Sequence, residues 1–267
     1  MPGKRDAKFK VGVTDWALKL AGDPEAVLWA SELLFDCLQV SIGRKPVDGK
    51  LALTSPALQK KYLAKAKELR CPVGSLCLDI LHDDGLKPGA GGKGQRWIAD
   101  AIPIARALGV QVILLPFFGE QELHGQADID HVGDVLRELA PAAAKGHVIL
   151  GLETTLSARD QVRLIERSRS KAVQVYYDVG NATASKFDVV EEIRWLGPSR
   201  LCEVHVKDNP HFLGEGAIDF RAIVAALADI GFSRNVVLET NAPSGDVEMD
   251  MIKNLNVMRA LIRERNA

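Results

Sequence analysis

The chain has 267 residues, of which 47% are hydrophobic and 26% are charged, so it can bury a large core. This length fits one domain of the barrel class better than two small domains. The formal net charge is -1, from 34 basic and 35 acidic residues without a long block of one sign. Such a balance argues against a surface that neutralises phosphates, and therefore against nucleic acid as a partner.

Cysteine usage and the apolar stretches bear on the compartment. The four cysteines lie far apart without a CxxC pair, so we expect them to be reduced and mostly buried: Cys37, Cys71, Cys77 and Cys202. The amino terminus, Met1 to Lys10, is charged and lacks the apolar core of a signal peptide. The longest apolar stretch, Ala101 to Gly119, is interrupted by proline, arginine and glutamine. We therefore expect a cytoplasmic protein without a membrane partner.

Short apolar runs rich in β-branched residues alternate along the chain with longer segments of helical period. Eight such runs are predicted strands: Phe9–Thr14, Cys37–Ile42, Val73–Asp79, Val110–Pro116, Val148–Glu153, Val173–Asp178, Leu201–Val206 and Asn235–Thr240. Eight parallel strands with crossover helices close into a barrel in about 250 residues. The sequence therefore predicts the α/β class and a single (β/α)8 TIM barrel over residues 1–267. An open doubly wound sheet shows the same alternation and is the alternative.

Predicted helix ends carry suitable capping residues. Asp23 and Ser55 each precede a proline, and Ser157 stands three residues before Asp160, as in a capping box. Helices should begin at these points. Four glycines come just before strands, where we expect left-handed helix C-caps: Gly109, Gly146, Gly197 and Gly231.

The loops that leave the strands are longer and more polar than those that enter them: Leu81–Gln95, Phe118–Asp128, Asp208–Asp219 and Asn241–Asp246. Because barrel active sites lie at this face, function is predicted there. Gly89–Gly94 satisfies G-x-G-x-x-G, but it does not directly follow a strand of a mononucleotide fold and lacks the later acidic partner. We interpret it as a mobile lid. Whether the loops after strands seven and eight hold a phosphate stays open.

Predicted strands five to eight each end on a residue of metal-ligand type: Glu153, Asp178, His205 and Glu239. Residues at the carboxyl ends of neighbouring barrel strands converge on the axis, so these four side chains can reach one ion. Three carboxylates and one imidazole suit Mn²⁺ first, with Mg²⁺, Co²⁺ or Zn²⁺ as alternatives. The structural alternatives are pairing of the carboxylates with Lys207 or a surface arginine, and a core role for His205.

Several polar and aromatic side chains are placed to line the same pocket. Lys207 lies two residues beyond His205, on the same strand face. Trp16, His82 and either Phe117 or Phe118 follow predicted strands and are expected to form walls of the pocket. Aromatic rings suit this place because sugars pack their C–H faces against them. Trp16, His82 and Lys207 are therefore predicted substrate-binding residues, and the family-like motifs described next add Asn181 and Glu215.

The strand-end motifs together resemble the sugar isomerase/epimerase group of xylose isomerase-like barrels, which also contains endonuclease IV. The motifs are Leu152-Glu153-Thr154, Asp178-Val179-Gly180-Asn181, His205-Val206-Lys207-Asp208, Leu213-Gly214-Glu215-Gly216 with Asp219-Phe220, and Leu238-Glu239-Thr240. The resemblance implies that Glu153, Asp178, His205 and Glu239 bind the metal, and that Glu153 and Glu239 are the acid/base pair on opposite sides of the substrate. Ketose 3-epimerases of this group often have a histidine at the position of Asn181, which leaves the substrate open.

The leading functional hypothesis is a metal-dependent isomerase or epimerase of a keto-sugar or sugar derivative, through proton abstraction and a metal-stabilised enediolate. The alternative is a dehydratase or β-eliminating lyase acting on an inosose or 3-keto-glycoside, which begins with the same proton abstraction. An endonuclease IV-like phosphodiesterase would need several zinc ions and more strand-end histidines than this chain offers. A non-catalytic carbohydrate-binding protein is the remaining class. The expected partner is a small carbohydrate, and a homo-oligomer stays open.

Overall fold

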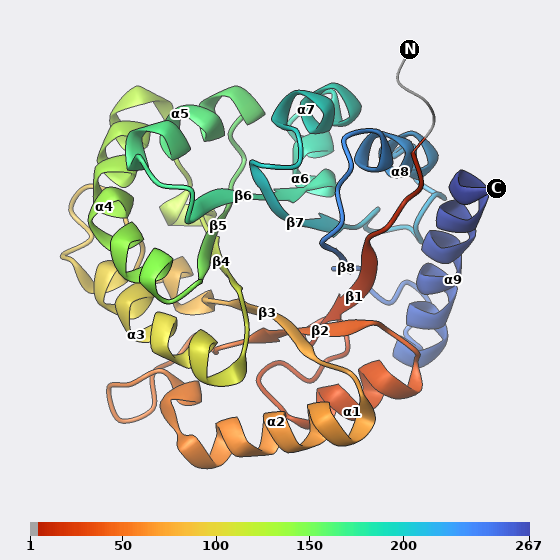
Figure 1. The fold of residues 1–267 in the computed structure, drawn as a ribbon, viewed down its shortest axis with the longest axis horizontal. Coiled ribbons are helices and arrows are strands. Elements are labelled where there is room, and N and C mark those ends of the chain that lie inside the picture. Colours follow the sequence, from red (N-terminus) through yellow and green to blue (C-terminus); the bar gives the residue numbers. More distant parts are fainter. Residues whose placement is uncertain (1–4) are drawn as a thin grey trace.

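The computed structural model describes residues 5–267, which form a closed barrel of eight parallel strands surrounded by helices (Figure 1). Of the charged segment Met1 to Lys10, residues 1–4 lie outside the described part. The strands are β1 (Lys10–Thr14), β2 (Cys37–Ser41), β3 (Val73–Cys77), β4 (Val112–Pro116), β5 (Ile149–Glu153), β6 (Val173–Asp178), β7 (Leu201–Val206) and β8 (Asn235–Leu238). The TIM barrel prediction is confirmed, and the open sheet is excluded because β1 pairs with β8.

The predicted strand bounds are right for β6 and β7 and too long elsewhere by one or two residues at an end. The prediction for β3 included Asp79, which instead begins the 3₁₀ helix η2 (Asp79–His82). The prediction for β8 included Glu239, which lies one residue past Leu238. Its backbone N–H still donates to the carbonyl of Val206 at 3.1 Å, so Glu239 keeps its place at the barrel end.

The helices pack around the outside of the barrel (Figure 1). They are α1 (Glu25–Glu32), α2 (Pro56–Leu69), α3 (Lys93–Leu108), α4 (Gly125–Lys145), α5 (Ala158–Ser168), α6 (Val179–Ala184), α7 (Val189–Leu196), α8 (Phe220–Asp229) and α9 (Val247–Asn266), with short η1 (Ala52–Thr54) and η3 (Gly119–Gln121). Ser55 and Ser157 cap α2 and α5 as predicted. The short α6 was not predicted, and its N-cap is Asp178.

Two of the four predicted left-handed glycine caps are wrong. Gly109 has a φ of 70° in the left-handed region, and Gly231 has a positive φ of 76°. Gly146 instead ends α4 in the right-handed region at φ -80°, and the next residue, His147, takes the positive φ of 54°. Gly197 has φ 65° but ψ 173°, which is not the left-handed helical conformation. The chain therefore reverses by a different turn at these two ends.

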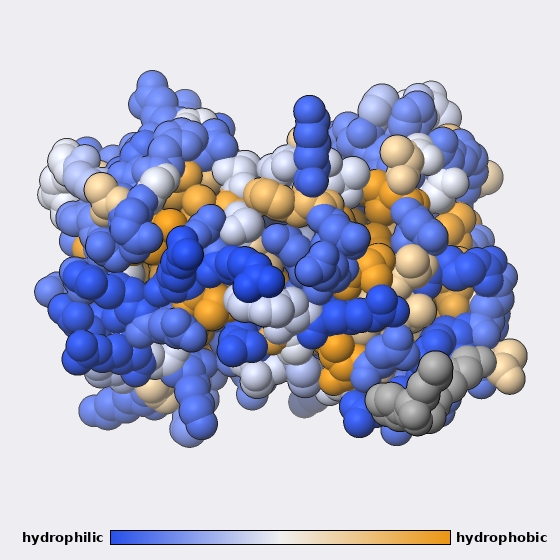
Figure 2. All heavy atoms as spheres, turned by 90° about the horizontal axis from the view of Figure 1, so that it is seen from above, coloured by the Kyte–Doolittle hydropathy of each residue, from blue (hydrophilic) through white to orange (hydrophobic). Residues whose placement is uncertain are grey.

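The core has two parts. A large cluster fills the layer between strands and helices, and a smaller one inside the barrel contains Val112, Leu114 and Tyr176 with two cysteine side chains. All four cysteines are free and buried, as predicted. Polar and charged side chains cover most of the face shown in Figure 2, with apolar side chains visible in small patches between them. Among residues 5–267, no helix combines the length and apolar character needed to cross a bilayer.

Candidate active site

The structure brings together the four strand-end residues singled out above. Glu153, Asp178 and His205 end or nearly end β5, β6 and β7, and Glu239 follows β8. One ligand atom from each lies within 4.8 Å of the others. The His205 side chain is fully buried, whereas that of Glu239 is 22% exposed. The cluster therefore lies at the floor of the barrel mouth, with Glu239 open toward solvent.

A buried glutamine orients the imidazole of His205. The Nε2 atom of His205 lies 2.6 Å from Oε1 of Gln39, whose own Nε2 donates to the hydroxyl of Tyr176 at 3.1 Å. Because the amide oxygen can only accept, Nε2 of His205 is the protonated nitrogen. Its Nδ1 atom then faces the carboxylates of Glu153, Glu239 and Asp178, at 3.2, 3.5 and 3.7 Å. An imidazole held in this way is typical of metal-binding histidines.

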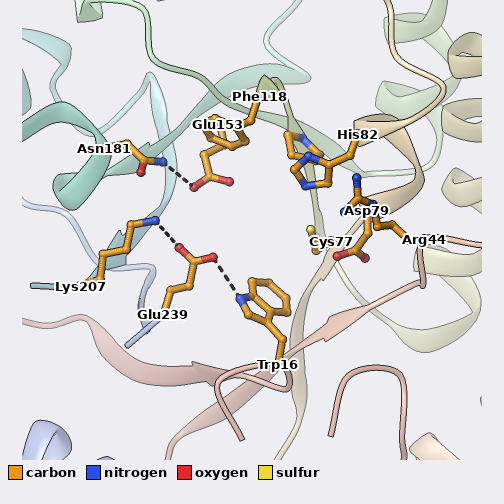
Figure 3. A pocket seen from close by; sticks show the side chains of 11 residues that line it. Trp16, Arg44, Cys77, Asp79, His82, Phe118, Glu153, Asn181, Lys207 and Glu239 are labelled. Atoms are coloured by element: carbon orange, nitrogen blue, oxygen red, sulfur yellow. Dashed lines mark hydrogen bonds and ion pairs between the residues drawn. The ribbon is translucent and has the colours of Figure 1, made fainter. Parts of the chain in front are cut away.

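Lys207 joins two of the carboxylates. Its Nζ atom lies 2.9 Å from Oδ2 of Asp178. The same atom lies 2.6 Å from Oε2 of Glu239, whose Oε1 accepts from the indole Nε1 of Trp16 at 3.0 Å (Figure 3). The structural alternative of carboxylate–lysine pairing is thus present for these two residues. Asn181 completes the arrangement, because its amide donates to Oε1 of Glu153 at 3.4 Å.

Burial and neighbouring charge act in opposite directions on these groups. Burial, assisted by the two glutamates, raises the pKa of Asp178 to about 7 despite the nearby ammonium of Lys207. Burial also opposes ionisation of Glu239, but His205 and Lys207 outweigh it and lower the pKa of that carboxyl to about 2. Burial lowers the pKa of His205, yet the surrounding carboxylates prevail and raise it. The carboxylates thus favour positive charge at the imidazole even though it is buried.

The donor set fits a divalent ion. Three clustered carboxylates face one lysine, which leaves negative charge to be compensated in a buried place. Oδ2 of Asp178 is buried and accepts no hydrogen bond of good geometry, although Lys207 lies close to it. A free carboxylate oxygen, two glutamates and an oriented imidazole nitrogen are ligands that Mn²⁺, Mg²⁺ and Zn²⁺ all accept.

A cavity of about 370 Å³ opens above the cluster. Its lining residues come from every strand end except that of β6, where α6 supplies one: Trp16, Arg44, Cys77, Asp79, His82, Pro116, Phe118, Glu153, Asn181, Lys207 and Glu239. Figure 3 shows the glutamates and Lys207 on one side and Arg44, Asp79 and His82 on the other. The cavity thus has the carboxylates and the lysine on the side of the cluster. The opposite side combines an arginine and an aspartate with a histidine.

Four of the five predicted substrate-binding residues line this cavity: Trp16, His82, Asn181 and Lys207. Glu215 does not; its exposed carboxylate pairs with Lys253 at 2.7 Å. Of the two phenylalanine candidates, Phe118 lines the cavity and Phe117 is buried in the core. Their roles with a substrate stay predictions.

Sequence reasoning missed Gln39, Arg44, Cys77 and Asp79. A signal existed for Gln39, because a glutamine inside the otherwise apolar strand Cys37–Ser41 needs a buried partner. Asp79 was assigned to the end of a strand, where its direction could not be known. Arg44 follows β2 in an irregular segment, and no local pattern indicated that its side chain returns to the cavity.

The glycine-rich segment Gly89–Gly94 comes after η2 and runs into the first turn of α3, whose N-cap is Gly92. It therefore follows a 3₁₀ helix and not a strand, unlike the dinucleotide-binding turn. None of its residues lines the cavity above the cluster. The proposed lid movement stays a prediction.

Comparison with known proteins agrees with the fold and defines the family. Residues 27–261 match the family model described as xylose isomerase-like TIM barrel. The match covers most of the chain, so the protein belongs to this family. A search of curated proteins finds no significant match.

Many solved structures share the fold. One is 3-keto-D-glucoside 4-epimerase, YcjR, from E. coli in its apo form, with 20% identity, a TM-score of 0.75 and coverage of 95% of this chain and 100% of that chain. D-psicose 3-epimerase from Clostridium cellulolyticum H10 with D-tagatose has 18% identity, a TM-score of 0.80 and coverage of 95% and 99%. The IOLI protein with a binding zinc atom has 16% identity, a TM-score of 0.74 and coverage of 96% and 99%.

Proposed function

We propose that the protein is a metal-dependent isomerase or epimerase of a keto-sugar or sugar derivative. The observation that carries this proposal is the pair Glu153 and Glu239, which reach one buried cluster from separate strands and both line the cavity above it. A reaction that removes a proton from one face of a carbon and returns one to the other face needs two such groups. The sugar epimerases among the similar structures support a carbohydrate substrate.

Glu153, Asp178, His205 and Glu239 would hold the ion, which when bound supplies positive charge for a developing substrate oxyanion. The oxygen-rich donor set favours Mn²⁺, whereas the similar IOLI structure contains zinc. Glu239 would act as the base, since it lines the cavity and is oriented by Trp16 and Lys207. Glu153 would hold the proton on the opposite face, where Asn181 contacts it at 3.4 Å.

The competing lyase would use the same base and lose a leaving group next to the carbanion carbon. Its product is an unsaturated ketone, whereas an epimerase or isomerase product has the mass of the substrate. The endonuclease-like alternative gains no support, because within residues 5–267 the candidate metal site has a single histidine. We call this site, formed by Glu153, Asp178, His205 and Glu239, the metal-ligand cluster.

Deuterium incorporation tests the proposal. Protein loaded with Mn²⁺ is incubated in D₂O with ketoses, inososes and 3-keto-glycosides, and carbon-bound deuterium is followed by NMR and mass spectrometry. We expect exchange next to the carbonyl of at least one compound, loss of exchange with chelator, and full exchange in the control Glu215→Gln, whose side chain lies outside the cavity. No exchange in any compound by fully loaded protein would overturn the proposal.

A further inference from the structure

A second cavity lies beside the first on the same face of the barrel. Its volume is about 420 Å³, compared with about 370 Å³ for the first, and both fall in the usual range for ligand pockets. We call it the outer lobe; it is lined by α6 on one side and by residues 207–211 and 217–218 on the other. Asn181 and Lys207 line both cavities.

The boundary between the two cavities includes these two side chains, and both also contact the metal-ligand cluster. Lys207 binds Asp178 and Glu239, and the amide of Asn181 contacts Glu153. Gly180 leaves room for the lysine stem, because a Cβ there would lie 2.5 Å from its Cγ. A ligand bound above the cluster therefore has the outer lobe as a direct neighbour across two side chains.

The far wall of the outer lobe is held in place by hydrogen bonds. Oδ2 of Asp208 accepts from the backbone N–H of Gly214 at 3.1 Å and of Gly216 at 2.9 Å. The backbone N–H of Leu213 donates to Oδ1 of the buried Asn254 at 2.9 Å. A wall that is already ordered costs little further entropy when a ligand binds.

The lining chemistry suits an uncharged sugar ring. Ala184, Pro210 and Ile218 offer apolar surface for C–H faces. The imidazole of His211 and the hydroxyl oxygen of Thr183, which donates to the carbonyl of Val179 and can still accept, offer hydrogen-bonding groups for hydroxyls.

Charge argues against a phosphate in either cavity. Among the described residues that line the two cavities, the Lys and Arg side chains are Lys207 and Arg44. Lys207 is engaged by two carboxylates, and Arg44 pairs with Asp83 at 3.0 Å. A phosphate would therefore have to displace a carboxylate from the only strong cations present.

We infer that the outer lobe binds the second sugar unit of an unphosphorylated glycoside whose keto-sugar unit lies above the metal-ligand cluster. This inference rests on the proposed function for the identity of the reacting unit. It names a substrate class, a neutral glycoside with at least two units, that the metal-ligand cluster alone does not specify.

The test compares matched ligands by calorimetry on the Mn²⁺-loaded protein: 3-keto-D-glucose with 3-keto-cellobiose, and D-fructose with isomaltulose, plus D-fructose 6-phosphate. Ala184→Trp fills the outer lobe from an exposed position, and Ala99→Trp, on an exposed face of α3, is the control. We expect at least tenfold tighter binding of the extended member of one pair. That gain should disappear in Ala184→Trp and persist in Ala99→Trp, and the phosphate should bind no tighter than D-fructose.

Equal affinity within both pairs, an equal loss for both members in Ala184→Trp, or tighter binding of the phosphate would overturn the inference. Deuterium exchange is recorded for the same ligands. If an extended ligand keeps its lobe-dependent gain but shows no exchange, the proposed function fails and the outer lobe stands. If exchange occurs without any gain from extension, the outer lobe fails and the proposed function stands.

Discussion

The two halves of the barrel mouth differ in what they can do. The half built on β5–β8 contains Glu153, Asp178, His205, Lys207 and Glu239, which contact one another. The half built on β1–β4 contributes aromatic side chains to the same cavity, together with Arg44 and Asp79. The rings of His82 and Phe118 are stacked, with their centroids 6.1 Å apart. This difference suggests that bond breaking belongs to the β5–β8 half and that the β1–β4 half shapes the space for the substrate.

Two carboxyl groups illustrate the contrast. Asp15 follows β1 and is fully buried, with backbone N–H donors from Gly22 and Ser41. Burial outweighs these hydrogen bonds and raises its pKa to about 7. Glu239 follows β8, and its cationic neighbours lower its pKa to about 2. Neighbouring cations thus lower the pKa of Glu239, whereas burial without a cation in contact raises that of Asp15.

The largest expected effect comes from removing a proposed metal ligand in the β5–β8 half. Asp178→Asn or His205→Ala should weaken divalent metal binding by more than about 10²-fold, because even loss of a residue behind a ligand costs 10 to 100-fold. The rise in melting temperature on adding Mn²⁺ should largely vanish in both variants. Metal content per chain and thermal unfolding are the measurements, with Glu215→Gln as the control. Wild-type stoichiometry in both variants would remove these residues from the metal site.

The second prediction concerns pH and Asp15. Its pKa in the folded protein is raised from 3.8 to about 7, so the protonated form favours folding. Its contribution is therefore complete below about pH 4 and is lost as the pH rises through 7. Asp15→Asn should therefore become more stable than wild type as the pH rises over this range. The expected gain is at most a few kcal/mol, since one pKa unit corresponds to about 1.4 kcal/mol. Urea unfolding from pH 4 to 8 measures the free energy of unfolding, with exposed Asp48→Asn as the control. If the pH profiles of Asp15→Asn and wild type ran parallel, the prediction would be contradicted.

The third prediction compares the cation in each half. Lys207 contacts two carboxylates of the proposed metal site, so its ammonium should repel a bound ion, whereas Arg44 pairs with exposed Asp83. Lys207→Met should tighten Mn²⁺ binding by about tenfold and destabilise the metal-free protein. Arg44→Met should change neither. Calorimetric titration with Mn²⁺ measures the affinity of each variant. Weaker metal binding in Lys207→Met would contradict the prediction and would mean that the lysine helps to hold the carboxylates in place for the ion.

The smallest expected effect is on the β1–β4 half. Phe118→Ala should raise KM by about two- to tenfold and change kcat less than about twofold, since an aromatic contact contributes roughly 0.5–1.5 kcal/mol to binding. The steady-state rate of deuterium exchange with the best compound of the panel provides both constants. A fall in kcat with KM unchanged would mean that this half also takes part in the chemical step.

How much the sequence predicts depends on how local the signal is. The barrel follows from eight alternating units, and the four ligand-type residues could be placed together because strand ends in a barrel converge. Gln39 and Arg44 could not be placed, since their contacts join segments far apart in sequence, such as Gln39 with His205. Glu215 was assigned from a family-like motif, but its side chain points to Lys253. Loop side chains are set by tertiary packing that periodicity does not describe.

The central claim is that Glu153 and Glu239 exchange the proton from opposite faces. Glu153→Gln and Glu239→Gln keep an oxygen ligand and remove the base, and each should lower turnover by at least about 10²-fold. The decisive measurement is deuterium wash-in to the substrate carbon in D₂O, at verified metal content. We predict that one variant still exchanges hydrogen without forming product and that the other loses exchange as well. Equal loss of exchange in both, or full activity in either, would contradict the two-base account.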